Sequence, residues 1–156
     1  MYAGSVELRD AGPDDFDTVR DLLGALHGSP PWGDERSADA RATFERILSN
    51  PTRRLLLAFV GDVAAGMIDA IVVPNLTRNA RPWTAIENIV VLPEMRRRGI
   101  GRMLIEGAID HARAQDCYKV QLVSATKREE AHALYRAAGF DGDVQGYRRY
   151  LIELDP

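Results

Sequence analysis

The most informative part of this sequence is Val90-Val91-Leu92-Pro93-Glu94-Met95-Arg96-Arg97-Arg98-Gly99-Ile100-Gly101-Arg102. A strand-like apolar run ends at Pro93, a short basic loop follows, and a helical pattern begins at Gly99. The first turn of a helix leaves backbone N–H groups unpaired, and the aligned peptide dipoles add a partial positive charge there. Phosphate oxygens suit such a turn, so this junction predicts an anion site.

The residue types in the loop favour a diphosphate. Gly99 and Gly101 lack a Cβ atom, so a bulky diphosphate can approach their backbone closely. Positive charge comes from four arginines, namely Arg96, Arg97, Arg98 and Arg102. The alternative is a solvated arginine run that merely precedes a helix. Nucleoside triphosphates are disfavoured because no Gly-Lys-Ser/Thr follows, and the third glycine of a dinucleotide fingerprint is missing.

The composition excludes several function classes. A chain of 156 residues with 46% hydrophobic content can bury one core, so we expect a single domain over residues 1–156. The formal net charge of -3 favours neither nucleic acid nor an acidic membrane as a partner. Cys117 is the single cysteine, and no Cys/His spacing predicts a metal site. Without a spanning apolar run or a secretion signal, we expect a cytoplasmic protein.

Hydrophobic periodicity predicts alternating strands and helices along the whole chain. Gly61-Asp62 is a short hairpin signal, and Gly139 suits a left-handed helix cap. The expected strands are Val6–Arg9, Arg54–Val60, Val63–Val73, Thr84–Leu92, Tyr118–Val123 and Tyr147–Leu154, and the expected helices are Phe16–His27, Ala38–Leu48, Gly99–Gln115 and Lys127–Ala138. The order β-α-α-β-β-β-α-β-α-β predicts an α/β or α+β fold with a mixed sheet.

Two motifs resemble the GCN5-related N-acetyltransferase (GNAT) superfamily. Its acetyl-CoA signature, Gln/Arg-x-x-Gly-x-Gly/Ala, is met by Arg96-Arg97-Arg98-Gly99-Ile100-Gly101. A second family motif resembles Ala131-x-x-x-Tyr135-x-x-x-Gly139-Phe140. Together the motifs cover about residues 87–140. The resemblance implies a GNAT fold, acetyl-CoA as cosubstrate, and transfer of the acetyl group to an amine.

The resemblance also implies how the cosubstrate binds. The strand that ends at Leu92 would have a bulge and splay from the strand that begins near Tyr118. Backbone groups of Ile89 and Val91 would pair with the pantetheine amides, and an N–H near Val90 would face the thioester oxygen. The pyrophosphate would lie against residues 96–102, Ile100 included. No metal is needed for this chemistry.

Tyr135 corresponds to the family's usual general acid. Its phenol has an unperturbed pKa of about 10, against about 8.5 for a thiol, so it can reprotonate a departing CoA thiolate. The alternative is an aromatic side chain that packs on the core side of a helix.

Glu87 is an acidic residue in an otherwise apolar strand, on the side of Ala85, Ile89 and Val91 if the strand is regular. A half-buried carboxylate in such a strand is energetically costly unless it has a partner or a function. It could act as the base, bind the amine, or lie at an exposed strand end. Asn88 on the other face and His132, one helical turn before Tyr135, are weaker candidates.

The acceptor is the least determined part of the function. We expect it to contact the two N-terminal helices, the loop Gly28–Gly33 with Trp32, and the loop Pro74–Pro82 with Trp83. A small-molecule amine or amino sugar is the first hypothesis, and a protein or peptide amine the second. Residues 87–91 and 117–120 resemble counterparts in glucosamine-6-phosphate N-acetyltransferases, but they belong to the shared CoA half, which does not fix the acceptor.

Two other hypotheses belong to different classes of protein. One is a non-catalytic acyl-CoA sensor or regulatory module. The other is a nucleic-acid or membrane contact through Arg96–Arg98, which a single short patch on an acidic chain supports poorly. A homodimer could form through the strand Tyr147–Leu154.

Overall fold

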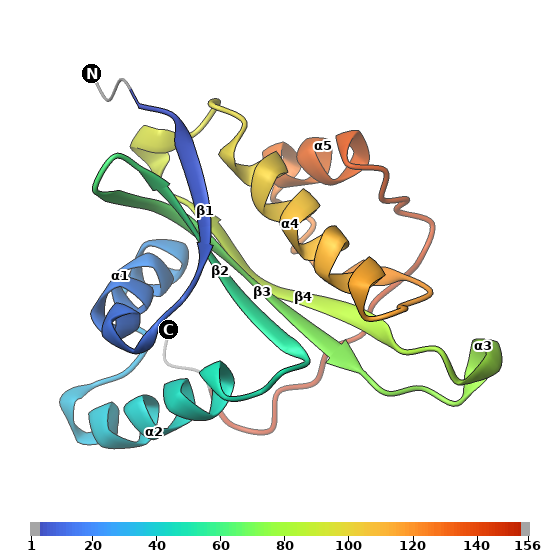
Figure 1. Ribbon diagram of the computed structural model, residues 1–156, viewed down its shortest axis with the longest axis horizontal. Coiled ribbons are helices and arrows are strands. Elements are labelled where there is room, and N and C mark those ends of the chain that lie inside the picture. Colours follow the sequence, from blue (N-terminus) through green and yellow to red (C-terminus); the bar gives the residue numbers. More distant parts are fainter. Residues whose placement is uncertain (1–3, 154–156) are drawn as a thin grey trace. The chain divides into compact units, whose positions relative to one another are not determined.

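A five-stranded sheet in the order β1-β2-β3-β4-β5 forms the centre of the computed structural model, which describes residues 4–153 (Figure 1). Neighbours are antiparallel from β1 to β4, and β5 pairs parallel with β4. The strands are β1 Val6–Asp10, β2 Arg53–Val60, β3 Val63–Val73, β4 Trp83–Val91 and β5 Val120–Leu122. The chain divides into two compact units, residues 1–122 and 123–156.

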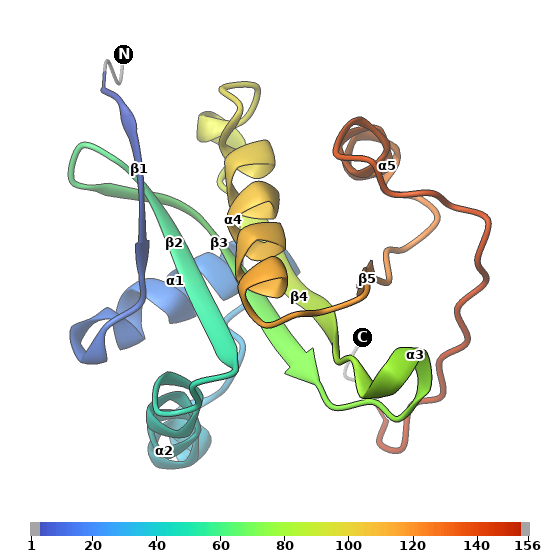
Figure 2. The same cartoon turned by 45° about the vertical axis from the view of Figure 1, so that its right-hand side comes forward.

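In the first unit, helices cover both faces of the sheet (Figures 1 and 2). Helices α1 (Phe16–His27) and α2 (Ser37–Leu48) lie on one face, and α4 (Ile100–Ala114) lies on the other. The core beneath α1 and α2 contains Phe16, Val19, Leu22, Phe44, Leu55, Leu57, Met67 and Val90. Short 3-10 turns precede three of the helices, at Pro13–Asp15, Asp34–Arg36 and Pro93–Met95.

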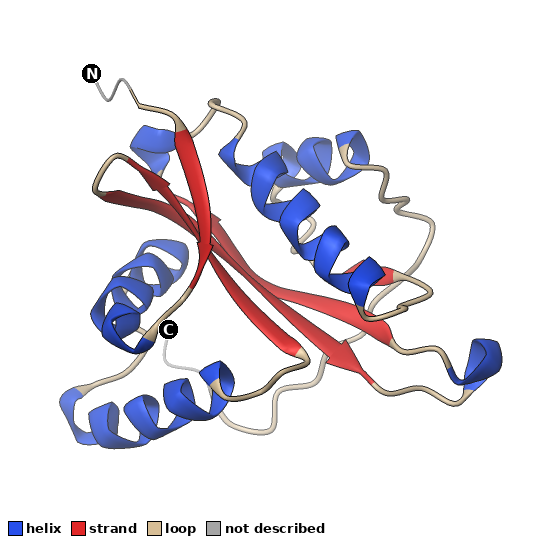
Figure 3. Ribbon diagram, in the orientation of Figure 1, coloured by secondary structure: helices blue, strands red, loops and turns tan. Residues whose placement is uncertain are grey.

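The α/β fold class and most of the expected elements are confirmed (Figure 3). The hairpin at Gly61-Asp62 joins β2 and β3, with Val60 opposite Val63. The loop after β3 contains a short turn, α3 (Thr77–Ala80), that was not expected. Its Arg78 and Asn79 have φ of 55° and 59°, so this turn is left-handed rather than a regular helix.

A bulge interrupts β4. Asp69 of β3 lies opposite Glu87, but Met67 lies opposite Val90, so β4 has one residue more than β3 between the two pairs. Asn88 in this segment has a positive φ of 52°. An extra residue of this kind bends the strand and changes which side chains share a face. The bulge that the family resemblance implied is therefore present.

Gly66 makes room for the bulged strand. It lies opposite Val91 in the register, and a Cβ atom on it would be 2.5 Å from the carbonyl oxygen of Val90. The same Cβ would lie 3.3 Å from Leu104 of α4. The backbone of β4 therefore passes closer to β3 at this point than any side chain would allow.

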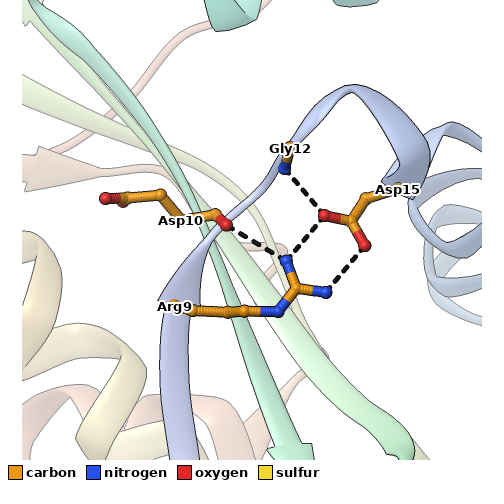
Figure 4. A network of polar contacts seen from close by, with 4 residues as sticks. All are labelled: Arg9, Asp10, Gly12 and Asp15. Carbon is orange, nitrogen blue, oxygen red and sulfur yellow. Dashed lines mark hydrogen bonds and ion pairs between the residues drawn. The ribbon is translucent and has the colours of Figure 1, made fainter.

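A network of polar contacts joins β1 to the start of α1 (Figure 4). Arg9 donates to both carboxylate oxygens of Asp15 at 2.7 and 2.8 Å, and the backbone N–H of Gly12 donates to the same carboxylate. The hydrogen bonds from Arg9 hold the pKa of the Asp15 carboxyl below its usual range, against the effect of burial. The charged Asp15 thus fixes the turn that leads into α1.

In the second unit, α5 (Glu129–Ala137) ends in a complete glycine cap. Gly139 has φ of 89° and donates to the carbonyl of Arg136, and Phe140 donates to the carbonyl of Tyr135. The rings of Tyr135 and Phe140 pack edge to face with centroids 6.2 Å apart. These two bonds and the apolar contact form the Schellman motif, so the expected cap at Gly139 is confirmed.

Two expected strands differ in the structure. The strand Tyr118–Val123 is shortened to Val120–Leu122. The strand Tyr147–Leu154 is wrong over residues 147–153, which form no strand, while Leu154 lies outside the described residues. The pattern there has strand-forming residue types, but Tyr147, Leu151 and Ile152 are exposed. A strand needs a ladder partner, and this segment has none in the described part of the chain.

We predict that Gly66→Ala destabilises the fold and weakens acetyl-CoA binding. The new Cβ must push the bulged part of β4 away, at a cost of about 1–3 kcal/mol in the free energy of unfolding. Urea unfolding and calorimetric titration with acetyl-CoA measure the two effects. Gly142→Ala is the matched control, because a Cβ there meets nothing within 4 Å. Equal stability of the two variants would contradict the close approach.

Candidate active site

The turn between β4 and α4 has an exposed backbone. Arg97 and Gly99 have positive φ of 63° and 78°, and Gly99 is the N-cap residue of α4. No side chain in the described part of the chain caps this helix, and its first turn contains no acidic residue. The N–H groups of the first turn are therefore available to an anion.

Two buried side chains anchor this turn. Met95 and Ile100 are 0% and 1% exposed, whereas residues 96–99 between them are exposed. The turn is thus held at both ends by the core while its backbone faces solvent. Ile100, expected among the cosubstrate-binding residues, has a buried side chain, so only its backbone can contact a ligand.

The arginines differ in their surroundings. The Nε of Arg96 donates to the carbonyl of Val91 at 3.3 Å, which joins the basic loop to the end of β4. Arg97, Arg98 and Arg102 are exposed, and Gly101 is half-buried in the first turn of α4. The four arginines therefore place positive charge in and next to the turn that contains Gly99 and Gly101.

The outer edge of β4 is open beyond Ile86. β5 pairs only with Thr84, Ala85 and Ile86, and residues 87–91 have no partner on that side among the described residues. Val90 is buried in the core beneath α1 and α2, while Ile89 and Val91 are half-buried. An extended ligand can therefore add to this edge as a short strand would.

Glu87 lies in β4 just before the bulge, and its setting differs from the expectation. The side chain is exposed rather than half-buried. Because of the bulge it shares a face with Ala85 and Val90, not with Ile89 and Val91 as in a regular strand. This is the face that α1 and α2 cover, so Glu87 lies on the side where we expected the acceptor.

Sequence reasoning missed two charged residues beside Glu87. Asp69 lies directly opposite Glu87 on β3 and is 2% exposed. Arg53 of β2 donates from Nε to Asp69 Oδ1 at 2.9 Å and from Nη2 to Oδ2. A lone acidic residue inside the apolar run 63–73 was the available signal. An acid at that position needs a buried partner.

Tyr135 belongs to the second unit, and its side chain is 6% exposed there. Burial raises the pKa of its phenol above the usual value. The Arg128 charge and the nearby Ser124 hydroxyl lower this pKa to a smaller extent. The Ser124 hydroxyl is near the phenol but forms no hydrogen bond of normal geometry with it. The phenol is therefore protonated at neutral pH. His132 is half-buried one turn earlier, and Asn88 forms part of the bulge.

An open hollow of about 380 Å³ lies elsewhere in the first unit. It is lined by the ends of β1 and α2, the start of β2, and His111 and Gln115 near the end of α4. The Gly99 turn lies at the other end of α4. The hollow is therefore separate from the Gly99 turn, although Arg53, which binds Asp69 next to Glu87, is one of its lining residues.

Within residues 4–153, no helix is long and apolar enough to cross a membrane. The same residues contain no cluster of three His, Cys, Asp or Glu side chains that could hold a metal ion.

Known proteins resemble this chain over most of its length. Glucosamine 6-phosphate N-acetyltransferase of Trypanosoma brucei brucei is 30% identical over 135 residues, which cover 86% of this chain and 88% of the relative. Aminoalkylphosphonate N-acetyltransferase of Salmonella typhimurium is 31% identical, over 86% of this chain and 84% of the relative. A solved structure from Agrobacterium tumefaciens superposes with a TM-score of 0.84 at 34% identity, covering 92% of this chain and 99% of that one.

The family model described as acetyltransferase (GNAT) family matches residues 16–140. This range includes the Gly99 turn, the bulged strand β4 and the capped helix α5. The chain therefore belongs to the acetyltransferase (GNAT) family and uses acetyl-CoA as its cosubstrate.

Proposed function

We propose that this N-acetyltransferase acts on the primary amine of a small molecule that also has a phosphate or phosphonate group. The two curated relatives described above act, by their names, on an amino sugar phosphate and on aminoalkylphosphonates. The observation that best supports catalysis is the uncapped Gly99 turn beside the open edge of β4, with Glu87 on the same strand. The acetyl group then passes directly from acetyl-CoA to the amine in a ternary complex.

In this proposal the cosubstrate contacts backbone more than side chains. The pyrophosphate binds the N–H groups at Gly99, Ile100 and Gly101. The pantetheine arm lies along residues 89–91 of β4, and a backbone N–H near Val90 stabilises the oxyanion of the tetrahedral intermediate. Arg96, Arg97, Arg98 and Arg102 supply positive charge around the diphosphate.

The proton transfers involve two side chains. Glu87 accepts a proton from the acceptor ammonium, directly or through water, so that the amine nitrogen can attack the thioester carbon. After the attack, the nitrogen loses its second proton to water. When the carbon–sulfur bond breaks, the electron pair goes to sulfur, Tyr135 gives its phenolic proton to the thiolate, and the phenolate regains a proton from water. A neutral, buried phenol suits that second role.

Four further proposals concern the protein as a whole. The family match extends from residue 16 to residue 140 and spans the boundary after Leu122, which supports one acetyltransferase domain over residues 1–156. Exposed apolar side chains at Val144, Tyr147, Leu151 and Ile152 support a homodimer that covers them. The free Cys117 suits a reducing cytoplasm. Neither nucleic acid nor a membrane is a partner in this proposal.

We predict that acceptors with a phosphate or phosphonate group turn over best. Thiol release from acetyl-CoA is measured with matched pairs, such as glucosamine 6-phosphate against glucosamine, and with polyamines, amino acids and peptides. A higher kcat/KM for the phosphorylated member of each pair is expected. Turnover on peptides alone would identify a protein acetyltransferase. Binding of acetyl-CoA without turnover on any amine would identify a sensor.

We predict that Gly99→Ala weakens acetyl-CoA binding about tenfold, because a left-handed φ costs an alanine about 1–2 kcal/mol. Gly101→Ala has a similar effect through its contact with the diphosphate. Arg97→Ala weakens binding only about two- to threefold, since its exposed charge is screened by solvent. Calorimetric titration measures all three variants. A larger loss for Arg97→Ala than for the glycines would show that charge, not backbone, binds the pyrophosphate.

We predict that Tyr135→Phe lowers kcat by roughly 100-fold and leaves acetyl-CoA affinity nearly unchanged. Phenylalanine keeps the packing on Phe140 and removes only the proton donor. Steady-state kinetics and titration separate the two effects. Tyr147→Phe is the control, because the Tyr147 side chain is 88% exposed. If the two variants have equal turnover, Tyr135 is a packing residue and not the acid.

A further inference from the structure

Three charged side chains lie in a row across neighbouring strands on one face of the sheet. Glu87 of β4 is opposite Asp69 of β3, and Asp69 binds Arg53 of β2. Asp69 also lies opposite Leu55, whose side chain belongs to the core beneath α1 and α2. We call Arg53, Asp69 and Glu87 the charged row.

The middle member of the charged row cannot serve as the base itself. Asp69 is 2% exposed, and each of its carboxylate oxygens accepts a hydrogen bond from the Arg53 guanidinium. A proton from an acceptor would have to displace this ion pair. Glu87, in contrast, is exposed and forms no ion pair among the described residues. The two carboxylates therefore have different roles.

Arg53 compensates a repulsion within the charged row. Side chains directly opposite each other in an antiparallel pair have Cβ atoms about 4.5–5.5 Å apart, and like charges there repel. The pKa of Arg53 is raised, first by its hydrogen bonds to Asp69, against a lowering by burial, and further by the charges of Asp69 and Glu87. Its positive charge thus acts on both carboxylates.

Other charged groups near this face are engaged elsewhere. On α1, which packs on β4, Arg20 bridges Asp17 and Asp21, and His27 is exposed in the last turn. Lys119, just before β5, lies 5.1 Å from the ring centroid of Trp83. Helix α4 packs on the opposite face, where Arg54 pairs with Asp10. On the α2 side of this face, Arg36 pairs with Asp39, and Arg41 lies 4.2 Å from the ring centroid of Phe16. The charged groups on the strands next to Glu87 are therefore Asp69 and Arg53.

We propose that Arg53 and Asp69 are positioning residues that leave one net negative charge on the acceptor face, located at Glu87. The acceptor ammonium then meets a carboxylate whose neighbouring carboxylate is already neutralised by a guanidinium. This proposal rests on the proposed role of Glu87 in binding or deprotonating the amine.

The loss of Arg53 and the loss of Asp69 change the charge next to Glu87 in opposite directions. Without Arg53, two facing carboxylates lack a counter-ion, and one of them holds a proton to a higher pH. Without the charge of Asp69, the guanidinium acts on Glu87 alone, which favours its carboxylate form and repels the ammonium. If both charges are removed, Glu87 again provides the single net negative charge.

The test is the pH dependence of kcat/KM with the best acceptor of the panel, for Asp69→Asn, Arg53→Gln and the double variant. The acid limb should move to lower pH by about 0.5–1 unit in Asp69→Asn and to higher pH by a similar amount in Arg53→Gln. The double variant should return to within about 0.3 unit of the wild type, because it loses one positive and one negative charge, so the net charge next to Glu87 is the same as in the wild type. In Asp69→Asn, the fold increase in KM for the acceptor should exceed the fold decrease in kcat.

Matched variants separate this inference from a structural effect. Arg54→Gln removes a neighbouring ion-paired arginine that points to the α4 face, and it should leave the acid limb in place. Arg53→Lys keeps the charge and should restore most of the wild-type profile. If Arg53→Gln does not fold, the comparison of Asp69→Asn with the double variant still tests the compensation.

Glu87→Gln distinguishes the two levels of the proposal. If it leaves kcat/KM and the acid limb unchanged, the proposed role of Glu87 fails. If it removes the acid limb while Asp69→Asn and Arg53→Gln move that limb in the same direction or not at all, Glu87 keeps its role and the charged row is refuted.

Discussion

The structure depends on one constraint: β4 must pair with β3 along its whole length while its other edge stays free beyond Ile86. The extra residue at the bulge meets this constraint, because it bends the strand without ending the ladder to β3. Asn88 takes the positive φ that the bulge requires, and Gly66 on β3 allows the bent backbone to pass. An open strand edge is usually an aggregation risk. Here the open edge is only a few residues long, and the Nε of Arg96 donates to the carbonyl of Val91, the last residue of β4.

The bulge also connects the two halves of the chemistry. After it, β4 ends at the Gly99 turn, whose buried anchors Met95 and Ile100 fix the position of the exposed backbone. Before the bulge, Glu87 lies on the face of the sheet that α1 and α2 cover. The edge proposed for the cosubstrate and the carboxylate proposed for the acceptor are therefore on one strand, on either side of the bulge. We therefore expect a change at the bulge to affect both the Gly99 turn and the charged row.

Local patterns predicted much of this architecture. The helices α1, α2 and α4 follow from apolar spacing, and the hairpin follows from Gly61-Asp62, because these signals act within a few residues. The bulge was predicted only from the family resemblance. The face of Glu87 was assigned for a regular strand, and its grouping with Ile89 and Val91 was wrong because one inserted residue reverses the alternation of side chains. The ion pair of Arg53 and Asp69 could not be predicted, because it depends on the register between β2 and β3, which local sequence patterns do not determine. The segment from Tyr147 to Glu153 has strand-forming residues, yet pairing needs a partner that local preference does not supply.

The two sides of the site follow different physical rules. In the proposed site, the Gly99 turn offers the diphosphate its backbone N–H groups and a left-handed glycine, and these features depend little on most surrounding side chains. In the proposal, the acceptor side relies on the charges of Glu87, Asp69 and Arg53, each of which a single substitution can alter. A buried carboxylate without its counter-ion is costly, so Asp69 and Arg53 can change only together. In this proposal, a joint change of the two leaves the single negative charge at Glu87 in place, whereas the loss of either one alone alters the charge that the acceptor meets.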